Sequence, residues 1–374
     1  MNFDLSEEQQ LVADSIERFV QDNYDLESRQ AIVAQTPGFS ETHWQTMSEL
    51  GWLGLPFAEA DGGFGGNQID TMVLMEQFGK GLVLEPFLAS IVLGGGVLKR
   101  VGSEVQKKSW LEGVIDGSKQ LALAYVEPES GDEPHNVALA GVSGTDGYTL
   151  TGTKCMVLHG GTADAFVVSF RTSGGTVDRS GITLALIPAD RQGLSVQGFP
   201  TVDGLQSAEL TFDKVAVSAD DILGEVDHGF AALNAAINDG ILAVAAEAVG
   251  AMEVLYKDTV AYTQDREQFG HPLADFQVLQ HRMVEMFMEY EQSKSLLYRA
   301  TMEVAANGED AQRNVHALKH LIGKASSFVG ENAVQTHGGM GVTEELRVGH
   351  YFKRLLVIEA QFGNTDYHLE QFAA

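Results

Sequence analysis

The chain has 374 residues, of which 44% are hydrophobic, with 41 glycines and 8 prolines, a composition typical of a folded protein with more than one structural unit. Its 24 basic and 52 acidic residues give a net charge of −28, which disfavours binding to nucleic acid and to anionic membrane surfaces. Cys155 is the single cysteine, so an intrachain disulfide and a cysteine-rich zinc site are both excluded.

The N-terminal residues lack the cationic and apolar regions of a signal peptide, and no run of about 18 apolar residues follows. We therefore expect a cytoplasmic protein without membrane insertion. After Ser6, apolar residues at helical spacing predict an amphipathic helix, and further helices are expected up to about Gly117. The glycine-rich segment 61–66 interrupts them and is predicted to be a tight turn rather than a phosphate-binding loop.

From about Lys119 to Leu223, short β-prone runs separated by Gly, Asp and Ser predict an antiparallel β unit, with strands near 120–126, 148–158, 165–170, 182–187 and 209–217. Long helical patterns then return over 233–263, 272–306 and 311–336. The sequence thus predicts an α+β protein of three domains. These are an N-terminal helical domain (1–118), a middle antiparallel β domain (119–226) and a C-terminal four-helix bundle (227–374).

No G-x-G-x-x-G motif lies between a predicted strand and helix, so a dinucleotide would have to be held without a Rossmann unit. The histidines show no metal-ligand spacing, and no metal site is expected.

Two segments of the C-terminal region carry a family resemblance. The stretch Asp265-Arg-Glu-Gln-Phe-Gly270, continued by His-Pro-Leu-Ala-Asp-Phe-Gln, is similar to the R-x-Q-F-G…F-Q motif of acyl-CoA dehydrogenases. Further on, Gln335-Thr-His-Gly-Gly-Met-Gly341 is similar to the family's Q-x-x-G-G-x-G segment. The length and the α–β–α order extend the resemblance over nearly the whole chain, and it implies FAD as the cofactor and the acyl-CoA dehydrogenase fold.

In this family the two segments reach across a subunit interface to the diphosphate and adenosine of the neighbour's FAD. The resemblance assigns that role here to six residues: Arg266, Gln268, Phe269, Gln335, Gly338 and Gly339. The chemistry agrees, because a guanidinium presents five donors suited to a diphosphate. Taken singly, an arginine at a helix end or a pair of glycines is more often a feature of helix termination.

The family's reaction needs a carboxylate base for the α-proton of the thioester while the flavin accepts the β-hydride. By resemblance, the two alternative base positions are occupied by Phe362 and Gly240, and neither residue can accept a proton. Glu247, two helical turns after Gly240, is the candidate for a displaced base, and Asp239 is a second one. A buried or interfacial structural role is the alternative for Glu247.

The segment that would face a flavin ring also departs from the family pattern. In place of T-E-P-x-A-G-S-D the chain has Tyr125-Val-Glu-Pro-Glu-Ser-Gly-Asp132, so Val126 replaces the hydroxyl and Glu129 replaces a small residue. In place of W-I-T-N it has Met156-Val-Leu-His159. The chain therefore keeps the residues that reach a neighbour's FAD and lacks those that would hold its own flavin ring.

This asymmetry is most similar to the smaller subunits of heteromeric, pimeloyl-CoA dehydrogenase-type enzymes. The resemblance implies a non-catalytic subunit that completes the FAD site of a larger catalytic subunit, in a two-plus-two heterotetramer. An acyl-CoA from fatty acid or dicarboxylic acid metabolism would be the substrate, and electron-transfer flavoprotein the acceptor. A self-sufficient homo-oligomeric dehydrogenase using Glu247 or Asp239, and a cofactor-free scaffold subunit, are the alternatives.

Overall fold

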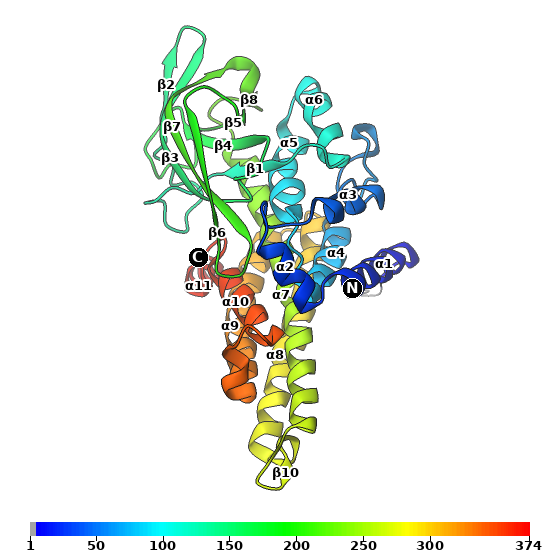
Figure 1. The fold of residues 1–374 in the computed structure, drawn as a ribbon. Coiled ribbons are helices and arrows are strands. Elements are labelled where there is room, and N and C mark those ends of the chain that lie inside the picture. Colours follow the sequence, from blue (N-terminus) through cyan, green and yellow to red (C-terminus); the bar gives the residue numbers. More distant parts are fainter. Residues whose placement is uncertain (1–4) are drawn as a thin grey trace. The chain divides into compact units, whose positions relative to one another are not determined.

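The computed structural model describes residues 5–374, and its element order confirms the predicted sequence of helices, sheet and helices (Figure 1). Helix α1 (Glu7–Asn23) begins where expected, because Ser6 accepts a hydrogen bond from the Gln9 backbone while the Gln9 side chain accepts one from the Ser6 N–H. The next elements are α2 (Leu26–Val33), α3 (Glu41–Glu49), η1 (Glu59–Asp61), α4 (Gln68–Gly81), η2 (Phe87–Gly94), α5 (Gly95–Val101) and α6 (Glu104–Ile115).

The glycine-rich segment 61–66 is a tight turn. The backbone N–H groups of Gly63, Phe64, Gly65 and Gly66 each donate to a carbonyl of the preceding segment 54–58. These donors are already used within the chain, so they are not available to a phosphate group.

The middle region contains two four-stranded sheets, with strand orders β1-β4-β5-β8 and β2-β3-β7-β6. Strands are found near all five predicted ranges, and β2, β6 and β8 are additional. The bounds are β1 (Leu121–Ala124), β2 (Gly141–Gly144), β3 (Gly147–Leu158), β4 (Ala165–Arg171), β5 (Ile182–Pro188), β6 (Leu194–Pro200), β7 (Gln206–Ser218), η3 (Ala219–Asp221) and β8 (Ile222–Leu223).

The prediction of a purely antiparallel unit needs one correction, because β1 pairs with β4 in parallel. The named strands otherwise pair antiparallel throughout this region of the described chain. The parallel pair is possible because the β2–β3 hairpin lies between β1 and β4 in sequence, and a parallel pair needs a long connection.

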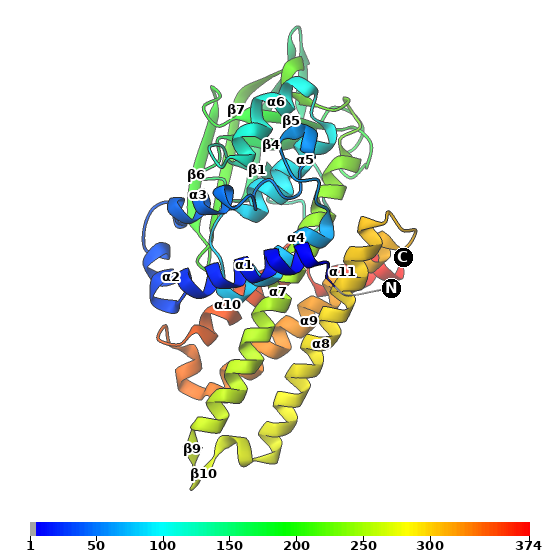
Figure 2. The ribbon, with the colours of Figure 1, turned by 90° about the vertical axis from the view of Figure 1, so that its right-hand side faces the viewer.

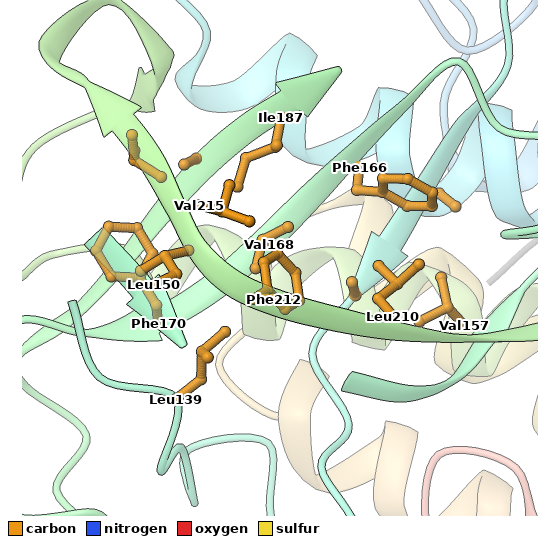
Figure 3. Packing of buried hydrophobic residues seen from close by; sticks show 14 of the residues in the cluster. Leu139, Leu150, Val157, Phe166, Val168, Phe170, Ile187, Leu210, Phe212 and Val215 are labelled. Carbon is orange, nitrogen blue, oxygen red and sulfur yellow. The ribbon is translucent and has the colours of Figure 1, made fainter. Parts of the chain in front are cut away.

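The core of the middle region lies between the two sheets, where alternate side chains from both are fully buried (Figure 3). Phe166, Val168 and Phe170 follow the two-residue period of β4. In β7 the buried set changes from even to odd positions after Phe212, at a register shift where Lys214 has a φ of 54°. This bulge keeps apolar side chains pointing inward along the whole long strand.

The C-terminal region consists of α7 (Phe230–Asp265), α8 (Gln277–Ala305), α9 (Ala311–His337), α10 (Arg347–Ala360) and α11 (Thr365–Ala373), so the three predicted long helices are confirmed. A short hairpin, β9 (Glu267–Gln268) and β10 (His271–Pro272), and the turn η4 (Leu273–Asp275) join α7 to α8 (Figure 2). The turn η5 (Gly338–Val342) follows α9. Helix α7 is apolar and long enough to cross a membrane, because an 18-residue stretch of it has a mean hydropathy of 1.4. This stretch is 89% buried inside the fold, as in a core helix.

By internal contacts the chain forms two compact units. One comprises the segment that ends at Ala31 together with Asn67–Val83 and Ile241–Ala374, and the other comprises Ile32–Gly66 and Leu84–Gly240. Because these units combine segments from different predicted domains, the division at residues 118 and 226 stays a prediction.

Within the first unit, α4 and α7 cross with their backbones in contact. A side chain on Gly79 would overlap the carbonyl group of Glu247, and one on Gly250 would overlap that of Glu76. Each helix therefore presents a glycine to the carbonyl of a buried glutamate on the other helix. In both helices the glutamate lies three residues before the glycine, as Glu76 does before Gly79. Only glycine permits an approach this close.

Candidate functional site

Arg266, the first of the predicted FAD-binding residues, directly follows α7. Its N–H donates to the Tyr262 carbonyl at 2.9 Å, and its own carbonyl accepts from the Leu273 N–H at 2.8 Å. The backbone of Arg266 is thus fixed on both sides, while its side chain is exposed and makes no hydrogen bond or ion pair with residues 5–374. An exposed guanidinium on a fixed backbone, without a carboxylate partner among the described residues, is suited to binding an external anion.

Phe269 lies at the tip of the β9–β10 hairpin. It has a φ of 56°, in the left-handed region that non-glycine residues rarely adopt, and its side chain is 91% exposed. Its ring meets Phe276 edge to face at 6.2 Å. Strain and apolar exposure are both unfavourable in the isolated chain, which points to a contact with another molecule. Neighbouring Gln268 is also exposed and its side-chain amide donates to the Glu267 carbonyl.

At the end of α9, Gln335, Gly338 and Gly339 are all exposed. Gly338 has a φ of 61° and a ψ of −139°, a conformation accessible essentially only to glycine. Gly339 differs in its φ, which lies outside the left-handed region, whereas a Cβ at either glycine would have no described atom within 4 Å. Nothing within the described chain requires glycine at 339, so the open space suits the close approach of a ligand or partner.

A ring stack connects these two groups of residues. Tyr262, one helical turn before Arg266, stacks on His337, which directly precedes Gly338, with centroids 4.2 Å apart and planes at 26°. The structure therefore brings the Arg266 turn and the Gly338–Gly339 turn to neighbouring helix ends, while their binding of FAD stays a prediction. Tyr262 and His337 were not predicted, although their places on the last turns of two helices that end in ligand motifs could have indicated them.

These six residues fit one part of a dinucleotide. The free guanidinium of Arg266 matches a diphosphate, the open Gly339 backbone allows a bulky group to come close, and Phe269 offers an apolar face. The residues present on this surface are therefore compatible with FAD.

The two positions that resemble the family's base positions carry no carboxylate. Gly240 is buried within α7, and Phe362 lies in the turn between α10 and α11 with a φ of 64°. The adjacent Gln361 has both side-chain polar atoms buried and without a hydrogen-bond partner among the described residues. The segment is thus strained and still has no proton acceptor at residue 362.

A network from α9 and α11 holds this turn in place. Lys319, fully buried, donates to the carbonyls of Glu359 and Gly363, both at 2.8 Å. His368 contacts the Phe362 carbonyl through Nε2 at 3.0 Å and His316 through Nδ1 at 2.9 Å. Because a carbonyl only accepts, the neutral His368 ring carries its proton on Nε2 and accepts from His316 at Nδ1. Burial lowers the pKa of His368 to about 3, which keeps the ring neutral.

Glu247, the candidate displaced base, lies in a buried bidentate ion pair. Arg354 donates to its two carboxylate oxygens at 2.6 and 2.7 Å, and the side chains are 6% and 4% exposed, respectively, for Glu247 and Arg354. Both carboxylate oxygens are thus occupied by Arg354, in a pair that is almost fully buried. This geometry favours the structural alternative for Glu247.

Asp239, the second candidate, is paired as well. Its carboxylate accepts from Arg100 at 2.5 Å, and Arg100 also donates to the Gly96 carbonyl. The neighbouring Lys99 donates to the Pro56 carbonyl at 2.9 Å. Like Glu247, Asp239 is paired with an arginine, and this geometry is that of a structural ion pair.

The segment that resembles the flavin-facing strand forms an apolar surface. The Cys155 N–H donates to the Val126 carbonyl, and a bulge at the next residue leaves Met156 half exposed with a φ of 51°. The described segment therefore offers Val126 and Met156 where the family has a hydroxyl and an indole. No side-chain donor replaces them at these two positions.

Behind this surface, a buried ion pair that the sequence analysis missed fixes the loop after β1. Lys154 is fully buried and donates to Glu127 at 2.7 Å, to the Tyr125 carbonyl and to Ser169. Glu127 also accepts from the N–H groups of Ala138 and Leu139. Burial lowers the pKa of Lys154 to about 8, and Glu127 opposes this shift. Within the described chain, no group of three or more His, Cys, Asp or Glu residues is arranged to hold a metal ion.

Comparisons with known proteins agree along the whole chain. Models of the N-terminal, middle and C-terminal domains of acyl-CoA dehydrogenases match residues 6–118, 122–215 and 227–374. The chain is 27% identical to the probable acyl-CoA dehydrogenase YngJ of Bacillus subtilis, over 98% of this chain and 97% of that one.

Two solved structures are also similar. The ChsE4–ChsE5 complex of Mycobacterium tuberculosis matches at 25% identity and a TM-score of 0.89, over 100% of this chain and 98% of that one. PigA with FAD and proline matches at 25% identity and a TM-score of 0.92, with the same coverage. Both the fold and the use of FAD are thus common to the group of proteins that this chain resembles.

Proposed function

Because the chain belongs to the acyl-CoA dehydrogenase family, whose members bind FAD, we propose that it is the non-catalytic subunit of a heteromeric acyl-CoA dehydrogenase. In that role it completes the FAD site of a larger, catalytic homologue. One observation carries the proposal: the six candidate FAD-binding residues are all exposed, and the Arg266 side chain makes no hydrogen bond or ion pair with residues 5–374, while the two base positions are occupied by Gly240 and Phe362.

The chain's own part in such a site is binding rather than chemistry. Arg266 would hold the diphosphate, Gly338 and Gly339 would let the cofactor lie against the backbone, and Phe269 would cover its apolar side. Bound FAD supplies the hydride acceptor, and the proton acceptor would come from the larger subunit.

The surface around the hairpin supports a partner of similar fold. Apolar side chains that are 43–91% exposed lie on the hairpin and along the first part of α8: Phe269, Val278, Val284, Phe287 and Met288. Val284, Phe287 and Met288 share one side of α8, and an exposed apolar patch of this kind is typical of a subunit interface. The ChsE4–ChsE5 complex, a similar structure, is an assembly of named partner chains, which is consistent with a heteromer.

The self-sufficient dehydrogenase is the less favoured function, since Glu247 and Asp239 are both paired with arginines. The cofactor-free scaffold does not explain why Gly339 is open or why Arg266 has no ion pair with any residue from 5 onward. The two-plus-two stoichiometry, an acyl-CoA from fatty acid or dicarboxylic acid metabolism, electron-transfer flavoprotein as acceptor and a cytoplasmic location remain parts of the proposal.

The test replaces Arg266 with Ala in the tagged chain, isolated from its native host with its bound partner. Loss of a charge-assisted pair worth about 1.5–3 kcal/mol should weaken FAD binding by about 10- to 100-fold. Arg299→Ala is the matched control, because Arg299 is equally exposed, on α8, and no hydrogen bond or ion pair to the described residues is lost. Unchanged flavin content in the Arg266 variant would contradict the proposal, as would stoichiometric FAD and acyl-CoA oxidation by the chain alone.

A further inference from the structure

We propose that Tyr262 and His337 are positioning residues, whose ring stack sets the distance between the Arg266 turn and the Gly338–Gly339 turn. The inference rests on the proposed function, since the two turns are the two parts of the FAD half-site. It adds residues that touch neither the cofactor nor the substrate.

Each of the two rings is connected to its turn through the end of its own helix. On α7, Tyr262 accepts the Arg266 N–H through its carbonyl, and the Arg266 carbonyl accepts from Leu273 beyond the hairpin. Any displacement of the Tyr262 ring with the end of its helix therefore carries Arg266 with it.

On α9 the connection is equally short. His337 Nδ1 lies 2.8 Å from the Ala333 carbonyl, and because a carbonyl only accepts, Nδ1 must carry a proton. This hydrogen bond fixes the ring on the last turn of α9, and Gly338 follows immediately with its N–H bonded to Gln335. The imidazole thus has a set orientation toward Tyr262.

The rings of Tyr262 and His337 are in direct contact. The centroids lie 4.2 Å apart with nearly parallel planes, and His337 is only 5% exposed. Two flat, rigid rings in face contact define a separation more sharply than flexible aliphatic chains would. Arg266 and Gly338 belong to segments about 70 residues apart in sequence, so a side-chain contact between their helices is needed to hold them at a fixed spacing.

The distance between the Arg266 turn and the Gly338–Gly339 turn affects the affinity for FAD. FAD can contact Arg266 through its diphosphate and Gly339 through another part only when the distance between the two turns matches the cofactor. If this distance varies, the two contacts form together less often and the affinity falls. The stack would therefore influence how long FAD stays bound, beyond any effect on folding.

The experiment measures FAD release from the tagged chain isolated with its partner. Tyr262→Leu and His337→Leu remove the stack, and each should speed release by about two- to ten-fold, the factor that a ring-pair energy of about 0.5–1.5 kcal/mol produces. The double variant should release FAD no faster than either single one. Tyr262→Phe and His337→Phe keep two stacked rings and should release FAD at the original rate.

Several outcomes would overturn the inference. They are unchanged release in Tyr262→Leu, additive effects in the double variant, or equally fast release in His337→Phe and His337→Leu. If a leucine variant does not fold, the phenylalanine variants still test the inference, because faster release from Tyr262→Phe or His337→Phe, in which two stacked rings are kept, would overturn it. Faster release in Arg266→Ala with no change in Tyr262→Leu would reject the positioning role alone, whereas no change in either would reject the proposed function too.

Discussion

Replacing Glu247 with Ala tests whether this acid is structural. Arg354 donates two hydrogen bonds to Glu247, and both side chains are at least 94% buried, so the substitution leaves a buried guanidinium without its carboxylate. Breaking a buried pair in this way costs about 3–5 kcal/mol. We expect the unfolding free energy to fall by that amount, together with a cavity contribution from the lost side chain.

The assay is urea unfolding followed by circular dichroism, at fixed protein concentration because any association between chains makes the measured stability depend on concentration. The double change Glu247→Leu with Arg354→Met fills the same space without charges and should recover most of the loss. Glu247→Gln keeps the shape and removes the charge. A cost below about 1 kcal/mol for Glu247→Ala would refute the structural reasoning. A normal fold with complete loss of acyl-CoA oxidation in the Gln variant would make Glu247 the base after all.

Two further predictions follow from glycine geometry and from histidine burial. Gly339→Ala should change the unfolding free energy by less than about 0.5 kcal/mol and should weaken FAD binding. Gly338→Ala should lower the unfolding free energy by about 1–2 kcal/mol, because of its positive φ. Urea unfolding measures the stability, and flavin absorbance measures the bound FAD. A destabilised Gly339 variant would contradict this. His368, with its pKa lowered to about 3, should contribute stability that is complete above pH 6.5 and lost as the pH falls toward 3, about 2 kcal/mol between pH 7 and pH 5. His368→Gln should remove this part of the pH dependence, and an unchanged slope would argue against it.

Much of the fold was predictable because local patterns agree with the final structure. The capping box at Ser6 and the apolar periodicity of the three long C-terminal helices correspond to the elements found. The parallel pairing of β1 with β4 was not predictable, since it depends on which strand edge a distant segment meets. For the same reason, the grouping of α1 and α4 with the C-terminal helices in one compact unit was not predictable.

The candidate site divides in the same way. The exposed positions of Arg266 and Gly339 were predictable from motifs that are local in sequence. The partners of Glu247 and Asp239 were not, because Arg354 and Arg100 are more than 100 residues away along the chain and only the tertiary fold selects them. The role of each acid was therefore undecidable until its partner was known.

The crossing of α4 and α7 has a consequence for how this family member can change. Gly79 and Gly250 each face a carbonyl group of the opposing helix, so the two helices can pack this closely in only one register. A slide by one residue would bring Phe78 or Val249 against the opposing backbone and force the helices apart. Substitutions elsewhere in the chain can therefore accumulate without changing how these two helices meet, as long as both glycines are kept.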